Sequence, residues 1–195
     1  MTYGFQRTAT GRIVLRVDQV ERGLLASVAR QVIDLVKPDD PAPDQDPLAA
    51  QLGWIDGDIA VSDDPAVARL LPDAYEDPDD ARDFRRFTEN DLRQSKVQQA
   101  TTVLDEIERS GEKIAISSPD SWLGTLNDAR IAIGTRIQVS EDNHEELANL
   151  SEDDPRAGLF HVYDWLTFLQ ESLVRCLDPT LYGFAADDAP VIDDD

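Results

Sequence analysis

Seven charged or amide side chains lie inside two strongly helical stretches, and their types and spacing give them the clearest capacity for chemistry. A charge among apolar neighbours must be paired or hydrogen-bonded. An ion-pair network between helices is therefore predicted, and a small polar pocket for an anion is the alternative. The candidate residues are Glu89, Asp91, Arg93, Asn127, Asp128, Arg130 and Arg136.

Arg130 is the member of this group with the most apolar sequence neighbours. Residues 129 and 131–133 around it are all Ala or Ile, so the helix is apolar on several sides and the guanidinium should be partly desolvated. We expect it to have a carboxylate partner on a neighbouring helix, either Glu89 or Asp91.

Motifs for catalysis or metal binding are missing from the sequence. His144 is followed by two glutamates but not by a second histidine four residues on, and Asp56-Gly57-Asp58 lacks the rest of a calcium loop. Neither a phosphate-binding glycine loop nor a Gly-x-Ser-x-Gly elbow occurs. The sequence therefore predicts a protein that is not an enzyme and holds no metal or cofactor.

Cys176 is the only cysteine, so an intrachain disulfide is excluded. It follows Leu173 by three residues on an expected apolar stripe and has Asp178 close by. Such a thiol ionises poorly, and we expect an inert core cysteine, with a redox sensor as the alternative.

Helical periodicity dominates the elements that must position these residues. Long helices are predicted over residues 18–37, 88–110, 120–137 and 155–177, with Thr88 as the cap of the second. Shorter helices are predicted at 48–54, 65–71, 79–87 and 144–150. Residues 5–17 predict a hairpin, and residues 113–117 predict a five-residue extended piece. The expected fold is mainly α, a bundle of about four long helices with short extra helices and a minor N-terminal β hairpin.

The 195-residue sequence carries a net charge of −22, and the acid is unevenly placed. Residues 37–80 hold 13 acidic and 2 basic side chains, and residues 138–195 hold 15 and 2. A field of this sign repels nucleic-acid phosphate and anionic lipid. We therefore expect that the protein does not bind DNA strongly by itself and does not bind membranes.

The sequence also contains one basic patch, which comprises Arg82, Arg85, Arg86, Arg93 and Lys96. Acidic residues lie within one helical turn of these cations, so pairing along the helices is expected. Residues 90–137 resemble a helix-turn-helix in outline. Their second helix has little exposed basic surface, however, and a buried scaffold helix is the preferred interpretation.

The domain organisation is expected to be simple. Prolines and carboxylates at residues 38–47 predict a solvated acidic loop, and residues 185–195 predict a flexible acidic tail. Residues 1–184 should form a single helical domain. No apolar run approaches the roughly 18 residues that span a bilayer, and no export signal is visible, so a cytoplasmic location is expected.

Several segments carry a family resemblance: residues 87–93, 97–100, 122–130, 134–136 and 162–173. With the opening helix, they resemble an actinobacterial family with a domain of unknown function, typified by an oxidative-stress transcriptional regulator. Members are typically encoded beside the Clp adaptor and a JAMM-type metalloprotease. The resemblance implies a regulatory rather than a catalytic role. A switch that forms an intramolecular disulfide would need two thiols, and this sequence has Cys176 alone.

Two functions of different classes follow. The first is a cytoplasmic regulatory protein of transcription or the stress response that acts through a protein partner, with the transcription machinery as one candidate. The second is a small-molecule or anion-binding domain, or an unrecognised enzyme, that uses the Arg, Asn and Asp cluster. Aromatic residues at 160, 163, 165 and 168 predict a core or dimer contact, so a homodimer is left open.

Overall fold

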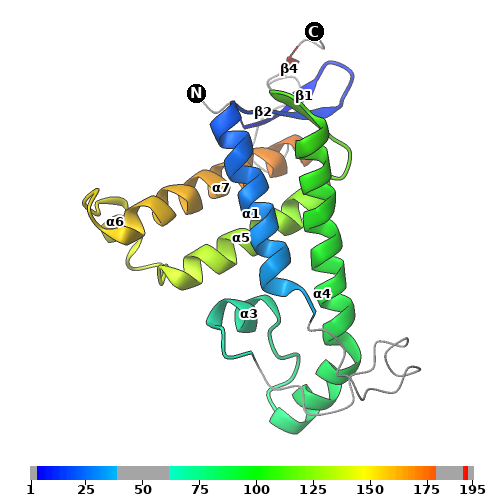
Figure 1. Ribbon diagram of the computed structural model, residues 1–195, viewed down its shortest axis with the longest axis vertical. Helices are drawn as coiled ribbons and strands as arrows, with labels where there is room; N and C mark the ends of the chain where they lie inside the picture. The colour runs from blue at the N-terminus through cyan, green and yellow to red at the C-terminus, as the bar shows by residue number, and fades with distance from the viewer. Residues whose placement is uncertain (1–3, 39–61, 179–190, 193–195) are drawn as a thin grey trace.

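The computed structural model describes residues 4–38, 62–178 and 191–192, which are mainly helical (Figure 1). Four long helices dominate, namely α1 (Gln19–Val36), α4 (Pro78–Arg109), α5 (Pro119–Arg136) and α7 (Pro155–Leu177). Two short helices, α3 (Pro65–Leu70) and α6 (His144–Ala148), accompany them. The predicted fold class is confirmed. The helix predicted at 48–54, and all of the predicted acidic loop except Pro38, lie outside the described residues.

The β element is larger than the predicted hairpin. Strands β1 (Phe5–Thr8) and β2 (Ile13–Arg16) are antiparallel, and β3 (Lys113–Ile116) pairs antiparallel with β2. Strand β4 (Val191–Ile192) pairs parallel with β1, giving the order β3-β2-β1-β4. The extended piece at 113–117 is therefore part of a sheet. Of the tail expected at 185–195, the two described residues also form a strand.

Helix α4 corrects the prediction of two separate helices at 79–87 and 88–110. It runs unbroken for 32 residues from an N-cap at Asp77, with Pro78 in the first turn. Thr88 does not cap a helix, because its hydroxyl donates to the Phe84 carbonyl at 2.9 Å within α4. This bond satisfies the hydroxyl without breaking the helix, and no Gly or Pro follows Pro78 before Gly111.

Helix α5 is the central helix, as predicted. It contacts α1, α3, α4 and α7, and its buried residues include Trp122, Leu126 and Ile133. The main core joins these side chains to apolar residues of α1, α7, the sheet and the C-terminal half of α4. A second, smaller core contains Val36, Val67, Leu70 and Leu71. It lies where α3 meets the end of α1.

Glu106 connects three elements inside the main core. It lies on α4 and is 9% exposed, and its carboxylate accepts from the Ser117 backbone N–H at 3.1 Å and from the Ser117 hydroxyl. It also accepts from Nε1 of Trp122 at 2.7 Å, and Trp122 is fully buried. One carboxylate thus fixes the end of β3 and the start of α5 against α4.

Candidate functional site

The seven predicted site residues do not form one network. Five of them lie in three separate places on α4 and α5, and the charge of the neighbouring side chains differs from place to place. Asp91 and Arg136 are exposed, and neither has a hydrogen bond or ion pair within the described ranges.

Glu89 lies between two arginines of its own helix. Its carboxylate accepts from Arg93 Nε at 2.8 Å and is 3.3 Å from Arg85 Nε, while Arg85 also pairs with Asp73. Arg93 Nη1 donates to the Val36 carbonyl at 3.5 Å, at the end of α1. The carbonyls of a last helical turn lack partners within their own helix, so this group serves to anchor α1 on α4.

Asp128 pairs with Lys96 and not with an arginine. The Lys96 Nζ to Asp128 Oδ1 distance is 2.7 Å, and the two side chains are 16% and 3% exposed. Burial raises the pKa of Asp128, against the lowering effect of the Lys96 hydrogen bond and charge. The interhelical ion pair that the sequence predicted is present between α4 and α5, with a different cation.

The prediction of a carboxylate partner for Arg130 was wrong. Its Nε donates to Thr167 Oγ1 at 2.9 Å and its Nη1 to Gln170 Oε1 at 2.8 Å, both on α7. Its Nη2 donates to the Tyr163 hydroxyl at 3.5 Å, and the guanidinium carbon is 5.3 Å from the centre of that ring. Neutral side chains therefore hold the guanidinium, and its charge is not cancelled by a carboxylate in the described chain.

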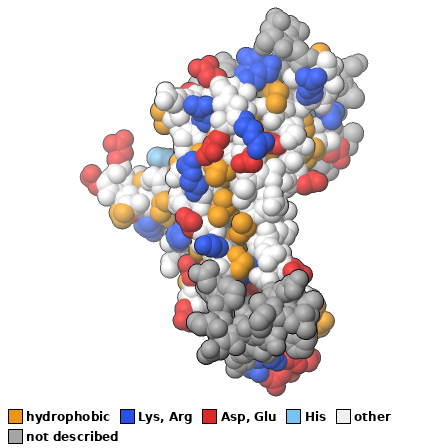
Figure 2. Space-filling view, turned by 45° about the vertical axis from the view of Figure 1, so that its right-hand side comes forward, with side chains coloured by type: hydrophobic (Ala, Val, Ile, Leu, Met, Phe, Trp, Pro, Cys, Tyr) orange, Lys and Arg blue, Asp and Glu red, His pale blue; other side chains and the backbone are white. Residues whose placement is uncertain are grey.

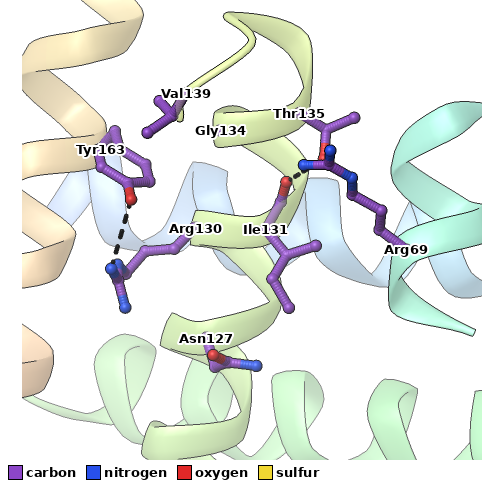
Figure 3. Close-up of a pocket in the computed structure, with 8 residues that line it drawn as sticks. All are labelled: Arg69, Asn127, Arg130, Ile131, Gly134, Thr135, Val139 and Tyr163. Carbon is purple, nitrogen blue, oxygen red and sulfur yellow. Dashed lines mark hydrogen bonds between the residues drawn. The ribbon is translucent and has the colours of Figure 1, made fainter. Parts of the chain in front are cut away.

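Arg130 and Asn127 line a groove between α3, α5 and α7, shown in Figure 3. The groove has a volume of about 410 Å³, and the described residues that line it include two arginines and no carboxylate. Arg130 points toward Tyr163, and Arg69 of α3 lies by Thr135 on the other side of the α5 face (Figure 3). The remaining lining residues are Ile131, Gly134, Thr135, Val139 and Tyr163. This is the candidate site of the molecule, and we call it the α5 groove.

Six lining residues of the α5 groove were not among the predicted site residues, namely Arg69, Ile131, Gly134, Thr135, Val139 and Tyr163. Gly134 lets α7 approach α5, because a Cβ atom there would be 3.2 Å from Tyr163 Cε2. Arg69 comes from a six-residue helix that shows no periodicity of its own. The only sequence signal was Gly134 beside Thr135, directly after the apolar residues 131–133.

The basic patch on α4 is neutralised, as predicted. Each of its cations lies within ion-pair distance of a carboxylate, and the pairs are Arg82–Asp79, Arg85–Asp73, Arg86–Asp83, Arg93–Glu89 and Lys96–Asp128. The helix-turn-helix alternative is not supported, since β3 lies between α4 and α5 and pairs with β2. The patch therefore offers no row of free cations to a DNA backbone.

Cys176 is half-buried on α7 and packs against the main core. Burial raises the pKa of its thiol, and the charge of Arg7 opposes this only in part. A raised pKa lowers the thiolate fraction at any given pH, so the thiol is a weak nucleophile.

We expect Cys176 to react with iodoacetamide at pH 8 several-fold more slowly in the folded protein than in urea, because unfolding restores the ordinary pKa. Mass spectrometry of the alkylated protein over time measures both rates. A folded rate equal to or above the unfolded one would contradict the inert-cysteine interpretation.

Neither a metal centre nor a membrane span is found in the described chain. Across residues 4–38, 62–178 and 191–192, no three His, Cys, Asp or Glu side chains are grouped to hold a metal ion. No helix in those ranges is both long enough and apolar enough to cross a bilayer. The aromatic residues of α7 differ in burial, because Phe160 is buried and Phe168 is 41% exposed. The homodimer stays a prediction.

Comparison with known proteins finds relatives that are named as regulators. Relatives from Mycobacterium bovis and Mycobacterium tuberculosis, both named oxidative stress regulator AosR, are 30% identical to it over 174 residues. That alignment covers 80% of this chain and 78% of each relative. No solved structure matches significantly. The family described as a domain of unknown function, DUF2017, matches residues 2–177, so the chain belongs to this family, as the resemblance indicated.

Proposed function

We propose that this chain is a stress-response regulator that acts by contacting a protein partner and does not bind DNA strongly by itself. The names of its mycobacterial relatives support the regulatory part. The neutralised cations of α4 and the net charge of −22 argue against tight unaided DNA binding.

An apolar hollow beside the outer half of α4 is the observation that carries the protein-contact part. It has a volume of about 230 Å³ between α4 and the link from α3. Phe84 and Leu92, each 43% exposed, line it, and the half-exposed ring of Tyr75 lies 5.5 Å from that of Phe84. Large apolar side chains gathered at the surface mark contact sites for other proteins.

The charge around the hollow indicates the chemistry of the partner. Residues 72–92 hold eight acidic and three basic side chains. Acidic side chains gather at the lower end of the molecule, where this segment lies (Figures 1 and 2). Charge complementarity favours a partner that offers an apolar side chain flanked by Lys or Arg.

Leu92→Ser tests this function against the control Leu159→Ser on α7. The two leucines are 43% and 41% exposed, so both substitutions should change the free energy of unfolding by no more than about 0.5 kcal/mol. In cells under peroxide stress, we expect Leu92→Ser to abolish the transcript response that depends on this protein, and Leu159→Ser to keep it. Co-purification followed by reconstitution with the purified partner should show the same difference.

Two results would contradict the proposal. One is a normal transcript response and normal partner binding with Leu92→Ser. The other is tight binding of the isolated chain to duplex DNA at physiological salt, with a dissociation constant below about 10⁻⁶ M, which is tighter than ordinary non-specific binding. Fluorescence anisotropy with a labelled duplex measures it.

A further inference from the structure

The α5 groove concentrates positive charge in a strongly acidic protein. Arg130 is held only by neutral partners, and Arg69 is exposed with no hydrogen bond or ion pair inside the described ranges. Among the described lining residues there is no carboxylate to cancel either charge. Two guanidinium groups on either side of one helix face therefore favour an anionic occupant (Figure 3).

Arg130 is oriented before any ligand arrives. A guanidinium has five N–H donors, and Thr167, Gln170 and the Tyr163 hydroxyl take one each. Two donors are left for an oxyanion, and the side chain has already lost its rotamer freedom. Such pre-organisation lowers the entropic cost of binding.

Neutral donors complete the lining. The Tyr163 oxygen accepts from Arg130, which leaves its own proton free to donate to a ligand oxygen. The Asn127 amide also faces the groove and has no hydrogen-bond partner among the residues that the structure describes. The groove volume of about 410 Å³ falls in the range of small-molecule sites.

We propose that the α5 groove binds a small metabolite carrying phosphate or carboxylate groups, with Arg69 and Arg130 each taking one oxyanion. Arginine suits both groups, because its planar fork of donors matches their oxygens. The hollow on α4 is lined by other residues, so this binding does not depend on the proposed protein contact.

The test is an NMR titration of the full ¹⁵N-labelled chain at constant ionic strength, with inorganic phosphate in one arm and malonate in the other. Saturable shifts of the backbone amides of Asn127, Thr135 and Tyr163 are expected in at least one arm. Saturation by phosphate alone assigns a phosphorylated ligand, and saturation by malonate alone assigns a dicarboxylate.

Three variants locate the binding. Arg69→Gln should weaken it by at least about tenfold while leaving the thermal melt unchanged, since Arg69 makes no hydrogen bond or ion pair with another described residue. Arg130→Gln should weaken it at least as much. Arg136→Gln makes the same charge change on α5 outside the groove, and it should bind within about twofold of wild type.

Absence of saturable shifts in both arms would overturn the proposal. So would shifts that persist in Arg69→Gln, because they would show that the ions bind the chain non-specifically.

Discussion

Glu106→Ala is expected to lower the free energy of unfolding by about 3 to 5 kcal/mol. The carboxylate is buried, and it accepts hydrogen bonds from Trp122 and from two groups of Ser117. Alanine would leave the indole N–H and the Ser117 N–H without partners inside the core, and each unsatisfied buried donor costs about 1 to 3 kcal/mol. The lost packing of the side chain adds to this.

Glu108→Ala is the matched control for this substitution. Glu108 lies on the same helix and pairs with Arg30 at 2.7 Å, but both side chains are more than half exposed. An exposed pair is worth at most about 1 kcal/mol. Urea unfolding followed by tryptophan fluorescence measures both variants, and equal midpoints for the two would show that the Glu106 contacts do not stabilise the core.

Asp128→Leu is expected to cost about 3 kcal/mol, because it leaves the Lys96 ammonium without its partner between α4 and α5. The double variant Lys96→Met with Asp128→Leu should recover most of this loss. Replacing a buried ion pair by apolar side chains of similar volume is often neutral or stabilising. A double-mutant cycle in urea measures the coupling, and additive losses in the double variant would contradict it.

The stability of wild type relative to Asp128→Leu should depend on pH, because the pKa of Asp128 is raised in the folded state. The folded state holds this proton more tightly than the unfolded state does. The part of the stability that comes from binding this proton is therefore complete below the unfolded pKa and is lost as the pH rises through the folded pKa. Wild type should gain stability relative to Asp128→Leu as the pH falls through that range.

Local signals in the sequence were sufficient for most of the helices. The capping box of Asp18 and Glu21, and the Asp-Pro starts of α3 and α7, place helix beginnings from neighbouring residues alone. The two-helix prediction for α4 failed because Thr88 is a good cap residue by type. Only the structure shows that its hydroxyl bonds back to the preceding turn.

The partners of the candidate residues were less predictable, because they depend on how the helices cross. Arg130 meets α7 across 33 to 40 positions of sequence, while the predicted partners lie on α4. Asn127 and Arg130 were correctly placed near one another, since they are one helical turn apart. Arg69 and Tyr163 reach the α5 groove from distant segments, and no periodicity or spacing encodes that meeting.

The length of α4 has a consequence for motion. The helix is about 48 Å long, and its C-terminal half packs in the main core, while no residue from 86 to 99 is buried. Opening of the outer half would leave the large core intact, so the two ends can exchange their amide hydrogens at different free energies. Occupation of the hollow beside Phe84 and Leu92 would slow amide hydrogen exchange in the outer half alone. Partner binding at the hollow would then order this half of α4 without changing the global free energy of unfolding.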